Sequence, residues 1–592
     1  MRKLTALLTV VLFVCQFGWA QQPETKTNET EQLRQQVEQL KQALAQLEQR
    51  LDAQEKKTEE AAKTPPAAPA ATPTDKKLEA KVGDLDRRMN RAERDIGLNR
   101  IHFSGDYRFE AHSITGHIPT YYNGMALQSN MVEAMFYSQA TGTMPSSVSQ
   151  INGYVATHYG DFQYFSNNLT FAQLKQGFGA MPAAQQQALM GMLMPSTLVK
   201  GYDYKNAVMY TNRLRLNFDA QMADNLRFVG RLSMYKVFGD STGVQVFNGQ
   251  PSSLNIDGTT ATVPNSDILR VERAFFTWSK IGGLPVYLSI GRRPSTDGPP
   301  MNIRQDEPRG GTPMGSLIDY QFDGITIGYH VTSKTEFRAC YGVGYESGFG
   351  SGDVTQLPQD RLSDTHLIGG NFDIWNTDKT LIQATIAKAF DVTDGFDGLV
   401  VMPSNPVTGQ AMPNFVMRYS PSANLGDIDL AGFLVQRRQG PFDLFGNINW
   451  VGLRPNSLTT PFGGLGTDPF ETPTNHDGNM VYAGVRYNFS NDKTKAGFEY
   501  NHGSKYWFNF AQAQDDIISP KTSTRGNVYE AYLTHRINRR FMFKADYIHY
   551  DYNWSGSGWH VGAPKALNSS PVLGFPTYDT ANMFTIGLTT RF

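Results

Sequence analysis

The sequence T-A-N-M-F-T-I-G-L-T-T-R-F at residues 580–592 is the clearest structural signal in the chain. In an extended backbone, successive side chains point to opposite faces. One face would carry Asn582, Phe584, Ile586, Leu588, Thr590 and Phe592, and the other Met583, Thr585, Gly587, Thr589 and Arg591. The first face is mainly apolar and the second is mainly small or polar. This period of two predicts a β-strand between an apolar and a polar environment.

The same alternation recurs upstream, which gives sixteen segments in all. They are residues 101–112, 208–222, 226–238, 269–279, 284–291, 317–331, 335–346, 366–375, 380–390, 428–437, 441–453, 479–489, 495–503, 527–537, 541–553 and 580–592. The second segment is the most regular, because Leu214 and Leu216 alternate with Arg213 and Arg215. Segment 269–279 mixes aromatic and charged residues, so its two faces cannot be assigned. Segment 317–331 changes phase near Asp323, which predicts a β-bulge.

The connections between these segments alternate strictly between short and long. Residues 223–225, 332–334, 376–378 and 538–540 are short and polar, as tight turns require. An even number of strands with short turns at one end and long loops at the other is typical of outer-membrane barrels. Closure leaves no unpaired strand edge in lipid. We therefore predict an all-β fold, a transmembrane antiparallel β-barrel of about sixteen strands over residues 99–592, with its long loops outside the cell.

The composition and the motifs of the chain argue against several classes of function. The net charge is −1 and no basic run occurs, so nucleic acid is not an expected partner. Only 18% of residues are charged, compared with about a quarter in typical soluble domains. The chain lacks Cys-x-x-Cys-His and His-Glu-x-x-His motifs. Gly239-Asp240-Ser241 resembles a lipase nucleophile triplet, but it lies at the end of a predicted strand that enters an external loop. We therefore expect no enzyme activity, no catalytic residue, no cofactor and no metal. Of the two cysteines, Cys340 is expected to face the barrel interior without an evident role.

The N-terminus has the pattern of a secretory signal peptide. Arg2 and Lys3 precede an apolar run over residues 4–14, and a small-x-Ala site follows at residues 18–20. We predict a signal peptide over residues 1–20. The alternative is an N-terminal membrane anchor, for which the apolar run is short.

Residues 21–98 are predicted to form a periplasmic α-helical stalk. Apolar residues are spaced four and three apart, as in a coiled coil. They are Leu33, Val37, Leu40, Leu44, Leu47 and Leu51 in a first seam, and Leu78, Val82, Leu85, Met89, Ala92 and Ile96 in a second. A Pro- and Ala-rich linker at residues 61–75 separates the seams. So narrow an apolar stripe predicts self-association, although two helices packed within their own domain remain an alternative.

These features together resemble general bacterial porins, and the terminal Phe592 resembles the C-terminal signal of Gram-negative outer-membrane proteins. The chain also resembles an uncharacterised family of porin-like proteins with a signal peptide and a coiled coil. That second resemblance is strongest at G-R-R-P-S-T-D-G-P-P, residues 291–300. The resemblance to general porins implies a trimer in outer-membrane lipid, passive diffusion of small polar solutes, and an external loop after the fifth strand that folds inward.

A barrel of this size leaves an aqueous channel, and charged side chains at its narrowest point set its selectivity. The candidate pore-lining residues on strands are Arg213, Arg215, Arg227, Arg231, Arg292 and Arg293. The loop at 294–316 adds Asp297, Arg304, Asp306, Glu307 and Arg309. Arginines that face an acidic loop would create a transverse field, and we expect a mild preference for anions. The alternative is that the arginines solvate the inner wall or pin the loop through ion pairs.

The first external loop, 113–207, is longer than porins normally carry. Its residues 169–194 are rich in Met and Ala and predict helix. The loop is expected either to plug the lumen, to cap the mouth or to pack on neighbouring loops. Two other functions remain open: a sheath around a multihaem cytochrome supplied by another chain, and an outer-membrane hydrolase, for which Gly239-Asp240-Ser241 is the only nucleophile-like triplet noted.

Overall fold

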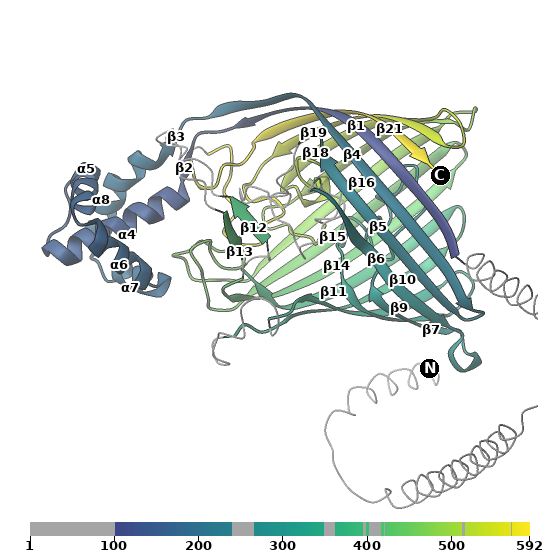
Figure 1. Ribbon diagram of the computed structural model, residues 1–592, viewed down its shortest axis with the longest axis horizontal. Coiled ribbons are helices and arrows are strands. Elements are labelled where there is room, and N and C mark those ends of the chain that lie inside the picture. Colours follow the sequence, from purple (N-terminus) through teal and green to yellow (C-terminus); the bar gives the residue numbers. More distant parts are fainter. Residues whose placement is uncertain are drawn as a thin grey trace, which may run out of the picture. The chain divides into compact units, whose positions relative to one another are not determined.

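In the computed structural model, sixteen antiparallel strands form one closed barrel (Figure 1). The model describes residues 101–239, 264, 266–347, 361–394, 398–401, 416–419, 421–511, 515–569 and 571–592. The barrel strands are β1 (Ile101–Ile118), β4 (Tyr202–Ala223), β5 (Leu226–Val237), β6 (Ser266–Ser279), β7 (Val286–Arg292), β8 (Asp323–His330), β9 (Glu336–Tyr345), β10 (Thr365–Asn376), β11 (Thr380–Thr393), β14 (Asn424–Gln439), β15 (Phe442–Pro455), β16 (His476–Asn488), β17 (Thr494–Gly503), β18 (Gly526–Arg536), β19 (Phe541–Tyr552) and β21 (Thr580–Arg591). The predicted barrel is confirmed, and every predicted segment overlaps one of its strands. The predicted signal peptide and stalk lie outside the described residues.

The barrel closes where the last strand meets the first. β1 pairs with β21 on one side and with β4 on the other. Beyond β21, the N–H of Phe592 donates to the carbonyl of Gly105 at 3.0 Å, and the N–H of Gly105 donates to the carbonyl of Phe592 at 2.9 Å. A Cβ at Gly105 would lie 2.6 Å from the Phe592 ring, so only glycine permits this close approach.

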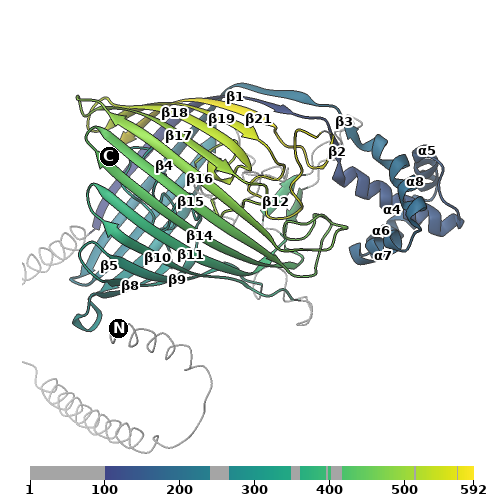
Figure 2. The same cartoon turned by 180° about the vertical axis from the view of Figure 1, so that it is seen from behind.

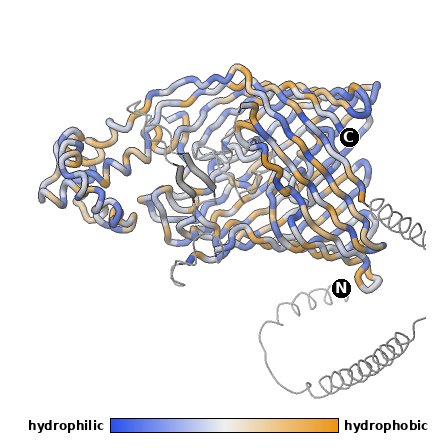
Figure 3. The backbone as a smooth tube through the Cα atoms, in the orientation of Figure 1, coloured by the Kyte–Doolittle hydropathy of each residue, from blue (hydrophilic) through white to orange (hydrophobic). Residues whose placement is uncertain are grey.

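The two faces of the barrel wall differ in polarity. In β1, Asp106, Arg108 and Glu110 are buried on the inner face, whereas Phe103 and Tyr107 are 65% and 36% exposed. Figure 3 shows the same alternation of hydrophilic and hydrophobic residues along many strands. Figure 2 shows the wall formed by β14 to β18. The result is an apolar outer surface and a polar interior, the reverse of a soluble protein.

Aromatic side chains gather near the short-turn end of the barrel. Phe228, Phe489, Phe541 and Phe592 are each between 36% and 56% exposed, and each lies beside a short turn or beyond the end of β21. An aromatic girdle of this kind is expected where a barrel wall meets the lipid headgroups.

Two predicted segments differ from the structure. Strand β8 begins only at Asp323, so the predicted strand over 317–322 and the predicted bulge are wrong. Those residues belong to a loop inside the barrel. In β6, the pairing with β5 shifts between Arg231 and Leu232, so Glu272 and Arg273 are both buried on the inner face. This bulge explains why the two faces of segment 269–279 could not be assigned from the sequence.

A helical cap lies beyond the long-loop end of the barrel (Figures 1 and 2). It consists of α4 (Gly124–Thr141), α5 (Val148–Thr157), α6 (Tyr159–Asn168), α7 (Phe171–Gly179) and α8 (Ala183–Leu193). Its own apolar core includes Leu127, Met131, Ile151, Leu174 and Leu193. The helix predicted over residues 169–194 is present as α7 and α8. The cap rests at the mouth and does not enter the barrel, so of the expected arrangements the structure has the cap and not the plug.

The cap is attached through strands. β1 and β4 continue as a paired ribbon as far as Ile118 and Tyr202. Beyond them, the short strand β2 (Tyr121–Asn123) pairs with β3 (Leu198–Val199) and with β20 (Val572–Gly574). A separate hairpin is formed by β12 (Gly398–Val401) and β13 (Val416–Tyr419). Within the described residues, no helix has the length and apolar character needed to cross a membrane.

Candidate functional site

Two loops enter the lumen and bind each other there. They are the β7–β8 loop (293–322) and the β17–β18 loop (504–525, described except for 512–514). The N–H of Asp319 donates to the carbonyl of Phe510 at 2.6 Å, and the N–H of Phe510 donates to the carbonyl of Leu317 at 3.1 Å. The two segments therefore form a small parallel bridge inside the barrel.

The β7–β8 loop is ion-paired to one side of the barrel through Asp297 and Glu307. Asp297 Oδ2 lies 2.8 Å from Arg273 Nη2 on β6 and 3.1 Å from Arg231 Nη1 on β5. Glu307 Oε1 lies 2.7 Å from Arg215 Nη2 on β4. Burial raises the pKa of Asp297, but the nearby arginines outweigh it and hold that pKa below its usual range.

Arg108 on β1 and Arg213 on β4 reach the other loop by pairing with Asp515. Arg213 Nη1 lies 2.8 Å from Asp515 Oδ2, and Arg215 Nε donates to Asp106 Oδ2 at 2.8 Å. Burial raises the pKa of Asp515, but Arg108 and Arg213 outweigh it, so Asp515 remains a carboxylate. The β4 arginines therefore connect β1 and both inner loops.

On the opposite side of the loop, Asp306 binds three cations. Its carboxylate lies 2.9 Å from Arg536 Nη2 and 3.3 Å from Arg486 Nη1, and it also pairs with Lys495 Nζ. These partners stand on β18, β16 and β17. Asp306 has φ = 49°, a left-handed conformation that Asp and Asn tolerate best among non-glycine residues.

Arg304 and Arg309 of this loop complete the attachment. Arg304 Nη1 lies 2.7 Å from Asp516 Oδ1 and 3.4 Å from Glu530 Oε2 on β18. Arg309 Nη1 lies 3.0 Å from Asp373 Oδ2 on β10. The β7–β8 loop is thus held by ion pairs to strands around much of the barrel circumference.

Three predicted residues lie apart from these clusters. Arg227 is more than half exposed near the short turn after β4 and pairs with Asp219. Arg292 pairs with Asp323 at 3.1 Å on the outer face, because Asp323 alternates with the exposed Ile325 and Ile327. Arg293 begins the β7–β8 loop.

The Arg293 guanidinium lies over the ring of Phe275, 5.1 Å from its centroid, and donates to Ser289. The structure therefore brings together Arg213, Arg215, Arg231, Asp297 and Glu307, and it places Arg304, Asp306 and Arg309 at separate attachment points of the same loop.

A vestibule opens beneath the β7–β8 loop at the short-turn end of the lumen, with a volume of about 420 Å³. Its cationic lining residues are Lys379, Arg437, Arg438, Arg486, Lys495, Arg536 and Arg591, and its acidic ones are Asp306, Glu307, Asp378 and Asp443. Seven cations face four carboxylates, so the vestibule is electropositive. Within the described residues, Lys379 and Arg437 have no ion-pair partner.

The rest of the lumen is fuller than the sequence suggested. Met314, Leu317 and Phe508 are completely buried between the inner loops and apolar side chains of the wall. The expected water-filled interior is therefore occupied, towards the long loops, by the chain itself. Cys340 stands on the inner face of β9, where its Sγ lies 3.3 Å from Thr326 Oγ1.

Sequence reasoning missed several lumen residues. Lys521 is 1% exposed, and its ammonium pairs with Glu499 on β17 and Glu530 on β18. The alternation of β17 and β18 could have placed both carboxylates in the lumen. Nothing local marks Lys521 as their partner. In the described part of the chain, no group of His, Cys, Asp and Glu side chains could hold a metal ion.

Asp319 is expected to make the stability of the folded barrel depend on pH. It is 3% exposed, and burial together with the Asp297 carboxylate raises its pKa well above the usual range. The folded protein thus retains a proton that the unfolded chain loses, and this contribution to stability declines as pH rises. We expect Asp319→Asn to stabilise the barrel by on the order of 1 kcal/mol at pH 8 and by less at pH 5. Urea unfolding midpoints at both pH values measure this, and an equal effect at both would contradict it.

Residues 203–592 match the model of a family described as protein of unknown function, DUF3373. The chain belongs to this family. The match spans β5 to β21 in full and nearly all of β4, so the family region includes both inner loops. No curated protein matches the chain.

Solved structures with similar chain traces are outer-membrane proteins. OprB of Pseudomonas putida is 10% identical with a TM-score of 0.37, and 84% of this chain and 96% of OprB are covered. OmpT of Vibrio cholerae is 13% identical with a TM-score of 0.34, covering 64% and 89%. OmpF of Salmonella typhi, solved with daunomycin, is 8% identical with a TM-score of 0.36, covering 83% and 97%.

Proposed function

We propose that this protein is an outer-membrane porin that admits small polar solutes, with a preference for anions. Solutes pass when the β7–β8 loop moves out of the lumen. The observation that carries the proposal is the electropositive vestibule directly beneath that loop. The loop stands where a solute would have to pass, and the excess of cations would concentrate anions at that point.

The polarity of the barrel wall supports a location in the outer membrane. A closed barrel with an apolar outer face and a polar interior is stable in lipid, because every wall backbone group is paired within the barrel. Short turns at one end and long loops at the other favour an orientation with the vestibule facing the periplasm. This orientation would place residues 21–98, proposed as a coiled-coil stalk after a signal peptide at 1–20, in the periplasm. Self-association is proposed from the same coiled-coil pattern, and a homotrimer from the resemblance of the sequence to porins.

The lumen contents disfavour the sheath function. A barrel that surrounds a cytochrome needs an interior wide enough for a second protein. Here Leu317, Phe508 and Trp507 are completely buried inside the barrel by the chain's own loops. No specific observation favours a hydrolase.

Reversal potentials in planar bilayers test the proposed selectivity. In a KCl gradient, we expect the channel to pass chloride more readily than potassium. The double variant Lys379→Gln and Arg437→Gln removes the two cations of the vestibule that have no ion-pair partner in the described structure. At a screening length of about 10 Å in 0.1 M salt, both charges act across a cavity of this size, so the permeability ratio should fall toward one.

A matched control removes two cations from the same end of the barrel outside the vestibule. Lys334→Gln and Lys493→Gln change turns that do not line it, so the selectivity should be unchanged. Clear cation selectivity of the native protein would contradict the proposal. So would an equal effect of the two double variants.

A further inference from the structure

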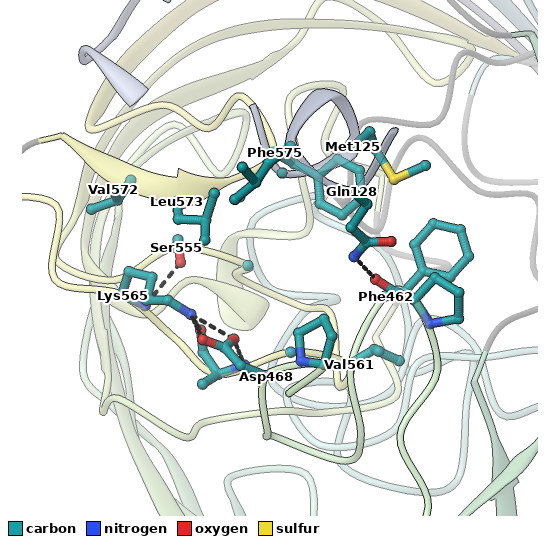
Figure 4. Close-up of a pocket in the computed structure, with 18 of the residues that line it drawn as sticks. Met125, Gln128, Phe462, Asp468, Ser555, Val561, Lys565, Val572, Leu573 and Phe575 are labelled. Carbon is teal, nitrogen blue, oxygen red and sulfur yellow. Dashed lines mark hydrogen bonds and ion pairs between the residues drawn. The ribbon is translucent and has the colours of Figure 1, made fainter. Parts of the chain in front are cut away.

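A second cavity lies at the long-loop end, between α4 of the cap and two loops, 456–475 and 553–579. Its volume is about 330 Å³, which is within the range of small-molecule sites. Figure 4 shows Met125 and Phe575 on one side of the cavity and Val561 and Phe462 on another. These side chains are apolar, so the cavity favours a ligand with an apolar body.

Two of the charged side chains that line the cavity, Lys565 and Asp468, neutralise each other, and a third, Glu471, is exposed to solvent. Lys565 Nζ lies 2.5 Å from Asp468 Oδ2, which leaves no net charge at that edge (Figure 4). Gln128 Nε2 donates to the carbonyl of Pro461 at 2.5 Å. Neither the Lys565–Asp468 pair nor Gln128 therefore favours a charged ligand.

Arg525 differs from them. It also lines the cavity, immediately before β18, and only 1% of it is exposed. Its guanidinium donates to three backbone carbonyls: Nε to Trp507 at 2.8 Å, Nη1 to Ser555 at 3.1 Å and Nη2 to Trp559 at 2.8 Å. A guanidinium has five N–H groups, so two remain, one on each terminal nitrogen.

No carboxylate in the described residues lies within ion-pair distance of Arg525, although most other buried arginines of this barrel have one. Burial lowers the pKa of Arg525 to about 9. A buried charge without a counter-charge is unfavourable, and an anion would relieve it.

Space in the cavity reaches the guanidinium beside Gly556. A Cβ built at Gly556 would lie 3.1 Å from Arg525 Nη1 and would meet no other atom within 4 Å. Gly556 has φ = 67°, so this position also favours glycine for its backbone. A ligand atom could therefore approach Nη1 from the cavity side.

We propose that this cavity binds an amphipathic monocarboxylate, with its carboxylate on the Arg525 guanidinium and its apolar body between α4 and the β20 segment. A carboxylate can accept from both terminal nitrogens at once. The neutral Asp468–Lys565 pair offers no second cation, so the cavity suits one negative charge and not two. The proposal does not depend on passage of solutes through the lumen.

Calorimetry on the full chain in lipid nanodiscs tests the proposal, with phenylbutyrate as the probe and phenylbutyramide as its uncharged analogue. Titration of empty nanodiscs removes the contribution from partition into lipid. We expect the native protein to bind the acid at least tenfold more tightly than the amide. Equal affinity for both, or no binding of the acid, would overturn the proposal.

Two variants locate the binding site. Met125→Trp fills the cavity from α4 and leaves Arg525 intact, so the dissociation constant for the acid should rise at least tenfold. The matched control Met144→Trp, at a 38% exposed position of the cap outside the cavity, should leave it unchanged. Unaltered binding by Met125→Trp would place the acid elsewhere and refute the assignment.

Arg525→Lys separates charge from geometry. It keeps the positive charge but loses the forked pair of donors, so we expect the preference for acid over amide to fall several-fold. If this variant does not fold, because three carbonyls lose their donor, the Met125→Trp result still decides the proposal. A folded Arg525→Lys protein with unchanged preference would contradict the role of the guanidinium.

Discussion

Replacing Asp306 with asparagine is expected to raise the open probability of the channel by about tenfold to a hundredfold. Asp306 holds the β7–β8 loop against Arg486, Lys495 and Arg536. Breaking a buried ion pair costs about 3–5 kcal/mol, and the Asp306 side chain is 10% exposed, so we expect a somewhat smaller loss. A difference of about 1.4 kcal/mol changes an equilibrium tenfold.

Asparagine is the informative replacement because it keeps the shape and tolerates the left-handed backbone of residue 306. Only the charge is lost, and three cations then repel one another beneath the loop. Single-channel recordings in planar bilayers measure the open probability and conductance. We also expect stronger anion selectivity, since one carboxylate leaves the vestibule.

Asp378→Asn is the matched control for this experiment. Asp378 lines the same vestibule and carries the same charge, but it lies exposed in the turn before β11 and has no described ion-pair partner. Its replacement should alter selectivity slightly and leave the open probability unchanged. If Asp306→Asn behaves like this control, the loop is not the element that closes the lumen.

Replacing Lys521 with methionine is expected to destabilise the barrel by about 3–5 kcal/mol. The ammonium is the shared partner of Glu499 and Glu530, and all three side chains are 1% exposed. Its loss leaves two buried carboxylates close together, and only Glu530 keeps a nearby cation, Arg304 at 3.4 Å. The urea midpoint of unfolding, followed by tryptophan fluorescence, should shift downward with little change in slope.

A second substitution distinguishes lost charge from lost packing. The double variant Lys521→Met and Glu499→Gln removes one of the stranded charges and should recover part of the stability. Lys493→Met, at an exposed turn position, is the control and should stay within about 0.5 kcal/mol of the native protein. No recovery in the double variant would show that repulsion between the carboxylates is not the cause.

The sequence alone was enough to predict the barrel wall, for a physical reason. Lipid outside and polar groups inside impose a period of two, and a regular strand such as β4 keeps it, so Arg213 and Arg215 were placed correctly on the inner face. The β6 bulge adds one residue and reverses the phase. Composition does not reveal where such an insertion occurs.

The ion-pair partners of the loop residues could not be predicted from the sequence, for a different reason. Asp306 meets cations that are 180 to 230 residues away in the chain, and no local pattern encodes that proximity. The segment 317–322 resembles a strand because Leu317 and Tyr320 are apolar, yet they are buried against another loop. Apolar spacing shows that a surface is covered and does not identify what covers it.

The ion pairs of the β7–β8 loop also have a mechanical consequence. A hollow cylinder of sixteen strands resists flattening only through its hydrogen-bonded wall. Here Arg273, Asp373 and Arg486, on three well-separated strands, are tied to one internal segment. These ion pairs connect distant parts of the wall through the loop, so they oppose flattening of the barrel by lateral pressure from the bilayer. A movement of the β7–β8 loop that widens the lumen breaks some of these ion pairs. The same movement therefore also makes the barrel easier to flatten.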